Sequence, residues 1–168
     1  MDLRKAFEEA YLAHKDRLLT LALALTGDRN TAEDVVHDVF ASLIKECPRL
    51  RHRNSLFAFL AVCARNRAYD LYRKATRENL RPAETPTLGR GAPRNDPAEQ
   101  VARNEEKEAL LGSVTRLPHR LREVLSLRIW GGLTFEEIAR LQKTTRSTAH
   151  ARYRQALDKL RMEFTKGE

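Results

Sequence analysis

Apolar residues recur every three or four positions along most of this chain, with polar residues between them. This spacing is typical of helices that bury one face, and it predicts three helices before residue 80, over 2–25, 31–47 and 55–78. After residue 97 it predicts helices over 98–115 and 118–130 and two more from 134 onward. No segment keeps the alternation of a half-buried strand, and no repeat of fixed period occurs. The sequence therefore predicts an all-α fold.

Four of the predicted helices have a stripe of apolar residues that we expect to face a core. In the first two helices the stripes are Leu3, Phe7, Tyr11, Leu18 and Leu25, and Val36, Val39, Phe40 and Leu43. In the third and the last helix they are Leu56, Phe57, Phe59 and Leu60, and Ala149, Tyr153, Ala156, Leu157, Leu160 and Phe164. The apolar run 18–25 is too short to cross a bilayer, so it is interpreted as part of a buried helix.

A break in composition separates the two groups of helices. Residues 80–97 contain four of the six prolines and two glycines, and they show no apolar periodicity. Such a segment cannot bury enough surface to offset its loss of conformational entropy, so a flexible linker is predicted over 81–97. We therefore expect two small helical domains, 1–80 and 98–168, with hydrophobic stripes that close within each half.

The second group ends in a helix-turn-helix pattern. Gly131 and Gly132 interrupt the preceding helix, and Thr134 with Glu137 forms a T-x-x-E capping box for the next one. A short turn at 142–144 follows, and Thr145 is expected to cap the last helix.

The outward face of that last helix carries Ser147, His150, Ala151, Arg154 and Gln155. Hydrogen-bond donors and a small residue near the N-terminal end of a helix suit the reading of base edges in the DNA major groove. An ordinary solvated face is the alternative. The capping box, the glycine pair, the short turn and the basic second helix together favour the DNA reader.

The second predicted helix exposes a polar ridge once its apolar stripe is buried. Asp34, His37, Asp38, Ala41 and Lys45 share this ridge. It is either a face that keeps the helix solvated or a docking surface for a basic partner helix.

Arginines and tyrosines interleave in the third helix, between residues 64 and 74. Arginines can follow phosphates while aromatic rings and amides meet unstacked bases, as in proteins that bind single strands. The alternative is that Tyr69 and Tyr72 close a small core while the cations stay hydrated.

Composition narrows the possible partners. The net charge of +8 and the pI of about 9.9 favour polyanions. Cys47 and Cys63 form neither a C-x-x-C pair nor a disulfide framework, and no signal peptide or membrane span is recognised, so we expect a reduced, cytoplasmic protein. The scattered histidines, and the lack of a metal-ligand cluster, phosphate loop or nucleophile–base set, argue against an enzyme, a cofactor or a metal site.

Two stretches carry a family resemblance. The N-terminal one reads AEDVVHDVF at 32–40 and FAFLAVCARNRAYDLYR at 57–73; the C-terminal one reads LPHRLREVLSLR at 117–128, GLTFEEIA at 132–139 and TAHARYRQAL at 148–157. In order and spacing the chain resembles a bacterial RNA polymerase sigma factor of the extracytoplasmic-function (ECF) group of the sigma-70 family. The resemblance implies a sigma region 2 bundle over 1–80 and a sigma region 4 helix-turn-helix over 98–168.

The resemblance also implies a function and its residues. The chain is expected to bind core RNA polymerase, at the β′ clamp and the β flap, to direct it to promoter DNA and to help melt the −10 region. An anti-sigma protein is the expected regulator. The implied contacts with the polymerase are Asp34, His37, Asp38 and Phe40. Those with the −10 element are Arg65, Asn66, Arg67, Tyr69 and Arg73. Those with the −35 element are Arg146, Ser147, His150, Ala151, Arg152, Arg154 and Gln155, with Arg152 on phosphate.

The chain departs from the family pattern at a few of these positions. His37 stands where glutamine is usual and Phe59 where tryptophan is usual, while His150-Ala151 replaces a basic residue and serine. A −35 preference therefore does not follow from the resemblance. The alternatives are a decoy that sequesters an anti-sigma protein, which would be expected to lack these basic residues, and a plain helix-turn-helix regulator, which would need a dimerisation or sensing domain.

Overall fold

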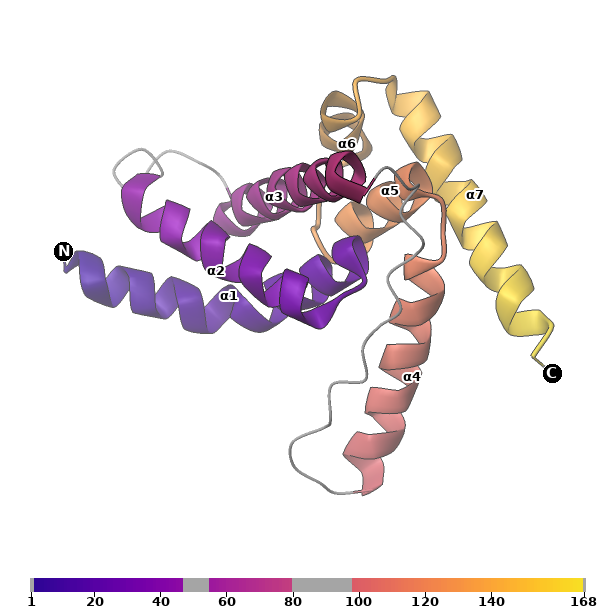
Figure 1. The fold of residues 1–168 in the computed structure, drawn as a ribbon, viewed down its shortest axis with the longest axis horizontal. Coiled ribbons are helices and arrows are strands. Elements are labelled where there is room, and N and C mark those ends of the chain that lie inside the picture. The colour runs from indigo at the N-terminus through magenta and orange to yellow at the C-terminus, as the bar shows by residue number, and fades with distance from the viewer. Residues whose placement is uncertain (1, 47–54, 80–97, 168) are drawn as a thin grey trace.

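A computed structural model of the chain describes residues 2–46, 55–79 and 98–167. This part consists of seven helices without a strand, which confirms the all-α class: α1 (Leu3–Thr26), α2 (Arg29–Glu46), α3 (Leu56–Asn79), α4 (Ala98–Thr115), α5 (His119–Ile129), α6 (Phe135–Leu141) and α7 (Arg146–Thr165). Helices α1, α2 and α3 pack against one another on one side of the molecule, and α4 to α7 lie on the other (Figure 1). The linker predicted over 81–97 lies outside the described residues.

Side-chain caps fix the N-terminal ends of α6 and α7 where the sequence predicts them. Thr134 and Glu137 form the capping box of α6: the Glu137 amide donates to Thr134 Oγ1 (3.2 Å) and the Thr134 amide to Glu137 Oε2 (3.0 Å). Thr145 caps α7 by accepting from the Thr148 amide. At Gly131, a Cβ would lie 2.5 Å from the carbonyl oxygen of Leu127, so only glycine fits the close turn after α5.

The start of α2 differs from the prediction. The helix begins at Arg29 because Asp28 caps it: Asp28 Oδ2 accepts from the Thr31 amide (2.9 Å) and from Thr31 Oγ1 (2.6 Å). These hydrogen bonds, from the hydroxyl first and the amide second, hold the pKa of Asp28 below its ordinary value. Thr31 therefore lies inside the first turn and supports the cap.

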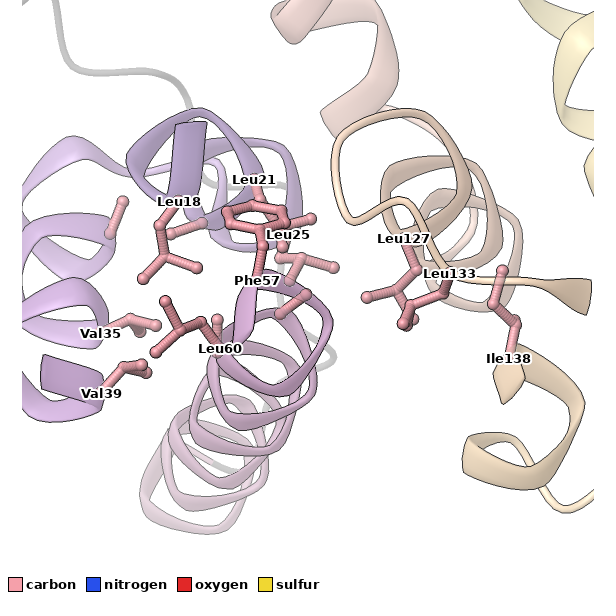
Figure 2. Packing of buried hydrophobic residues seen from close by; sticks show 14 of the residues in the cluster. Leu18, Leu21, Leu25, Val35, Val39, Phe57, Leu60, Leu127, Leu133 and Ile138 are labelled. Carbon is pink, nitrogen blue, oxygen red and sulfur yellow. The ribbon is translucent and has the colours of Figure 1, made fainter. Parts of the chain in front are cut away.

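Side chains from α1, α2 and α3 meet in the core of the N-terminal half. Figure 2 shows Leu18 and Leu21 of α1, Val35 and Val39 of α2 and Leu60 of α3 pointing toward one another. Val35 is fully buried although it lies outside the predicted stripe of α2. Close packing of these three helices gives α3 a fixed position for its polar face.

The hydrophobic core does not stop at the boundary between the halves. Val124, Leu127 and Leu133 of the C-terminal half belong to the same cluster as the core of the N-terminal half, and Ala24 of α1 belongs to the cluster between α4, α5 and α7. The stripes therefore do not close within each half. The physical reason is the apolar run 18–25, which has no polar face, so this part of α1 packs on α2 and α3 and also on α4 and α5.

Four residues of the predicted stripes are exposed instead of buried. Leu3 and Tyr11 near the start of α1 are 55% and 39% exposed, and Leu157 and Phe164 of α7 are 37% and 49% exposed. The described helices cover only one side of α1 before Leu18, and the C-terminal end of α7 projects past α5 (Figure 1). Periodicity therefore did not predict which residues of each stripe other helices cover, since Leu157 is exposed between the buried Ala156 and Leu160.

Replacing Asp28 by alanine is expected to lower the free energy of unfolding by about 1 kcal/mol, because it removes the cap of α2. Urea denaturation at pH 7 measures this change. The difference from wild type should shrink as the pH falls through the lowered pKa of Asp28, since a protonated carboxyl loses the same stabilisation. Asp158→Ala, on the exposed face of α7, is the matched control, and an equal loss there would contradict the capping role.

Candidate functional site

The predicted −35 residues lie on the first turns of α7, held there by an aromatic cluster. The Phe135 ring of α6 meets the His150 ring edge-on at 5.1 Å and the Tyr153 ring at 5.3 Å. The Arg128 guanidinium lies over the Phe135 ring, 4.9 Å from its centroid. Helix α6 therefore fixes the angle at which α7 leaves the turn. The exposed members of the predicted set are Arg146, Ser147, His150, Ala151, Arg154 and Gln155.

Arg152 differs from the rest of that set. It is half-buried, and its Nη1 donates to Gln142 Oε1 in the helix-turn-helix turn at 2.7 Å. Gln142 in turn donates from Nε2 to Glu123 Oε2 (2.8 Å) and to the Arg120 carbonyl (3.1 Å). Arg152 is thus oriented by the protein itself, toward the turn and α5.

The predicted −10 residues divide into two groups on α3. Asn66, Arg67 and Arg73 are exposed, whereas Arg65 and Tyr69 are half-buried against the C-terminal half. Arg65 forms an ion pair with Glu123 of α5, in which the two side chains are only 14% and 5% exposed. Its Nη2 also donates to the carbonyl of Leu141, at the end of α6 (3.3 Å).

Aromatic rings continue this contact along α3. The His119 ring of α5 stacks on Tyr72 with centroids 5.1 Å apart and planes 7° apart, and it lies 5.8 Å from Tyr69. The guanidinium groups of Arg65 and Arg73 lie over Tyr69 at 5.0 and 4.7 Å. The rings therefore pack on protein, as the second interpretation of the tyrosines expects, and they also stand among cations. Binding of a single strand stays a prediction.

The predicted polymerase-binding residues of α2 also differ in exposure. Asp34 and His37 are exposed, but Asp38 Oδ2 accepts from Arg67 Nε of α3 at 2.7 Å in a half-exposed ion pair. Phe40 is only 3% exposed and packs edge-on against Phe7 and Tyr11 of α1. From that position Phe40 affects a partner only through the packing of α2 on α1.

A cleft of about 820 Å³ lies between α3 and the helix-turn-helix. Its charged lining comprises Arg65, Asp70, Arg73, Arg120, Glu123, Lys143 and Arg152. Five cations against two carboxylates make the cleft basic, which suits a polyanion. Within the described residues, no group of three histidine, cysteine or acidic side chains is placed to hold a metal ion.

Burial determines the protonation of His119. Desolvation lowers the pKa of His119 from its ordinary value, and the cations of Arg122, Arg65 and Arg120 lower it further, while Glu123 opposes them. His119 is therefore neutral when it stacks on the two tyrosines at neutral pH.

The sequence interpretation missed the residues of the C-terminal half that face α3. His119, Glu123 and Gln142 carry no local signal, because their partners lie far away in the sequence; Glu123 and Arg65 are 58 positions apart. Glu123 is 4% exposed, although acidic residues are rarely buried without a partner. Only the packing of the halves brings Arg65 to it.

None of the helices in the described ranges is both long enough and apolar enough to cross a bilayer.

Comparison with known families and proteins gives consistent matches. Residues 10–78 match the model for sigma-70 region 2, and residues 114–162 match the one for sigma-70, region 4. The chain is 32% identical to the ECF RNA polymerase sigma factor SigD of Mycobacterium tuberculosis over 136 residues, which cover 80% of this chain and 63% of SigD. It is 26% identical to the ECF RNA polymerase sigma factor SigK of the same species over 162 residues, 93% of this chain and 84% of SigK. The chain thus spans less than two thirds of the length of SigD.

Two solved structures share the fold. CnrH, solved in complex with the cytosolic domain of CnrY, matches with a TM-score of 0.67 and 19% identity over 98% of this chain and 91% of that one. The sigma factor RpoE of Bartonella quintana, solved with the anti-sigma factor NepR, matches with a TM-score of 0.70 and 20% identity over 96% and 98% of the two chains.

Acidification is expected to destabilise the protein through His119. The pKa of His119 is lower in the folded protein than in the unfolded chain, so the unfolded chain binds the proton first as the pH falls. The contribution of neutral His119 to the free energy of unfolding is therefore complete above about pH 6.5 and is lost at lower pH. Urea denaturation between pH 7.5 and 5.5 should show a larger loss for wild type than for His119→Phe, which keeps a stacking ring but cannot titrate. The extra slope cannot exceed about 1.4 kcal/mol per pH unit, the value for one proton. Identical pH profiles would contradict this role of His119.

Proposed function

Because the chain belongs to the sigma-70 family, in its ECF group, we propose that it is a transcription initiation factor that binds core RNA polymerase, brings it to specific promoters and helps to melt the −10 region. In this proposal α7 reads the −35 duplex, α3 holds the unstacked −10 strand and α2 docks on the polymerase. The protein itself catalyses no reaction, and its place of action is the cytoplasm, with the polymerase.

The observation that carries the proposal is the exposed face of α7. Ser147, His150, Ala151 and Arg154 are spaced to lie on one side of the helix, and all four are exposed. Capping at Thr134 and Thr145 and the aromatic cluster around Phe135 hold this face at a fixed angle to α6. A major-groove reader needs such a pre-oriented face, because the hydrogen bonds to base edges are directional.

The face of α3 supports the second part of the proposal. Asn66, Arg67 and Arg73 are exposed around Tyr69, so phosphate-binding and base-binding groups alternate along less than three turns of helix. This combination fits a single strand better than a duplex, because an unstacked base has a free face on which a ring can stack.

The ridge of α2 supports docking on the polymerase. Asp34 and His37 are exposed on it, and the buried Phe40 and Val39 anchor the helix beneath. An acidic ridge on a rigid helix fits a basic clamp surface, because complementary charge speeds encounter and fixes register.

We extend the proposal to the domains and to a regulator. Residues 1–80 and 98–168 act as separate modules on the polymerase, joined by 81–97, and the β flap is the proposed partner of the second module. An anti-sigma protein is the proposed regulator. The support is the shared fold with RpoE, which was solved with the anti-sigma factor NepR.

Mixed with core RNA polymerase, the chain is expected to start transcripts whose upstream sequences share two separated elements. Asp34→Arg is expected to weaken binding to core polymerase, because it places a positive charge against a basic clamp and a lost desolvated charge pair costs about 2–5 kcal/mol. Co-purification with core polymerase and sequencing of the transcripts measure both effects.

The control for this experiment is Asp158→Arg, which makes the same charge change on the exposed face of α7 away from the ridge. Wild-type binding by Asp34→Arg would show that α2 is not the docking surface. Transcripts without shared upstream elements would contradict the proposed function as a whole.

Arg154→Ala and Asn66→Ala are expected to separate duplex reading from strand reading. Arg154 can make a bidentate base contact that contributes about 1–3 kcal/mol of discrimination, so its loss should weaken binding to a −35 duplex. Asn66→Ala should leave that duplex affinity unchanged and weaken binding to a template with the −10 strand exposed. Fluorescence titration of both variants, as holoenzyme, on both templates decides this, and equal losses on both would refute the division of labour.

A further inference from the structure

A second cavity, of about 630 Å³, lies where the end of α1 and the start of α2 meet α3 and the start of α5. Much of its wall is apolar, and the apolar lining residues are Leu25, Ala68, Leu71, Ala75, Leu117 and Pro118. No residue that is proposed to contact polymerase or DNA is among the described residues that line it. Binding sites for small molecules have this volume and this kind of wall, with a few polar groups that fix the orientation of the ligand.

Arg122 brings a positive charge to this cavity. The residue lines the cavity and is only 7% exposed. Its Nη1 donates to the carbonyl of Thr115, at the end of α4 (3.2 Å), and its Nη2 donates to Nδ1 of the neutral His119 at 3.4 Å. Within the described ranges Arg122 forms no ion pair, although an arginine is almost never buried so deeply without one.

The charge of Arg122 is incompletely balanced. A guanidinium has five N–H donors, and the protein uses two of them here. Burial lowers the pKa of Arg122, while Tyr72 and Glu123 act in the opposite direction, but an arginine stays charged at physiological pH. The carbonyl at the end of α4 offers only a partial negative charge. An anion in the cavity would complete the balance, because hydrogen bonds between two charged groups are about twice as strong as neutral ones.

The acidic residues of the same cavity restrict which anion fits. Asp28 already accepts two hydrogen bonds from Thr31 at the start of α2, and Glu78 is exposed, one turn after the exposed Lys74. Neither of them pairs with Arg122. Their negative charges repel a doubly charged phosphate more than a carboxylate, which carries a single charge. A carboxylate also matches the planar guanidinium with two parallel hydrogen bonds.

We propose that this cavity binds a small amphipathic carboxylate, with the carboxylate on Arg122 and an apolar body against Leu25, Leu71 and Leu117. The apolar body gains affinity by leaving water, as a side chain does in a protein core. The carboxylate gives the buried guanidinium a counter-ion, without which a buried charge is unfavourable. The site goes beyond the proposed function and does not depend on it.

Isothermal titration calorimetry of the full-length chain with three probes separates charge from apolar contact. Octanoate has a carboxylate and an apolar chain, 1-octanol has the chain without the charge, and acetate has the charge without the chain. Octanoate is expected to bind about tenfold more tightly than 1-octanol, since hydrogen bonds to a charged group are the stronger ones. Acetate is expected to bind more weakly than either, because it buries little apolar surface. Equal affinity for octanoate and 1-octanol, or acetate bound as tightly as octanoate, would overturn the proposal.

Arg122→Met tests the residue that recognises the carboxylate. Methionine keeps an unbranched side chain without the charge, so octanoate should fall to the affinity of 1-octanol while the affinity for 1-octanol stays near that of wild type. Arg120→Met is the matched control, because Arg120 lies on the same helix, is exposed and does not line this cavity. Its affinity for octanoate should equal that of wild type, and an equal loss in both variants would show only a general attraction of anions to a basic protein.

Ala68→Leu is the second variant, because Arg122 also supports the end of α4 and its loss can unfold the protein. Ala68 is half-buried on α3 and lines the cavity. A leucine there fills part of the cavity and leaves Arg122 in place, so it should weaken octanoate and 1-octanol by the same factor while circular dichroism shows wild-type helix content. Unchanged affinity for octanoate in this variant would overturn the site.

Nuclear magnetic resonance of the chain with labelled leucine methyl groups locates the bound octanoate. Shifts are expected for the cavity residues Leu25, Leu71 and Leu117 and not for Leu3 and Leu12, which are exposed on α1. The reverse pattern would place the ligand on the exposed part of α1 and contradict the proposal. None of these measurements uses polymerase or DNA, so failure here is separate from failure of the proposed function.

Discussion

The C-terminal part of α1 is the element on which the rest of the structure depends. Residues 18–25 carry apolar side chains around most of the helix, and a helix of this kind is typically buried by other elements. Helices α2 and α3 cover one side, and α4 and α5 cover another. Burial of apolar surface contributes about 25 cal/mol per Å² to the free energy of unfolding. Since both halves bury surface on this segment, it stabilises both of them. The relative position of α3 and α7, which carry the proposed DNA-binding residues, follows from how the halves meet there.

The polar contacts at this junction determine how the two halves are aligned more than they raise the free energy of unfolding. Desolvation of a buried ion pair such as Arg65 with Glu123 offsets much of its Coulomb attraction, so the apolar contacts supply most of the free energy. A buried charge without its partner is strongly unfavourable, which restricts the halves to the register in which Arg65 meets Glu123. The stacked rings of Tyr72 and His119 add a second restriction on the same register.

The sequence was sufficient to predict those features of the structure that depend on interactions between neighbouring residues. The helices, the capping box at Thr134 and the glycine pair at 131–132 depend on residues a few positions apart, and the structure confirms them. Asp28 instead of Thr31 at the start of α2 shows that even a cap is ambiguous when two suitable residues are close together. The exposure of Leu3 and Phe164 could not be predicted, because it depends on which other elements reach the ends of α1 and α7. The roles of Glu123, His119 and Gln142 could not be predicted either, since each depends on a partner or on packing fixed only by the fold.

The ion pair between Asp38 and Arg67 has a thermodynamic consequence. It joins the ridge of α2 to the polar face of α3, and both side chains are more than two fifths exposed. A basic protein surface that binds the carboxylate of Asp38 frees the guanidinium of Arg67. In the same way, an anion that binds Arg67 frees the carboxylate of Asp38. By linkage, each of these binding events raises the affinity for the other by the same factor. The two faces of this small bundle are therefore coupled by competition within one salt bridge, without any change in the backbone.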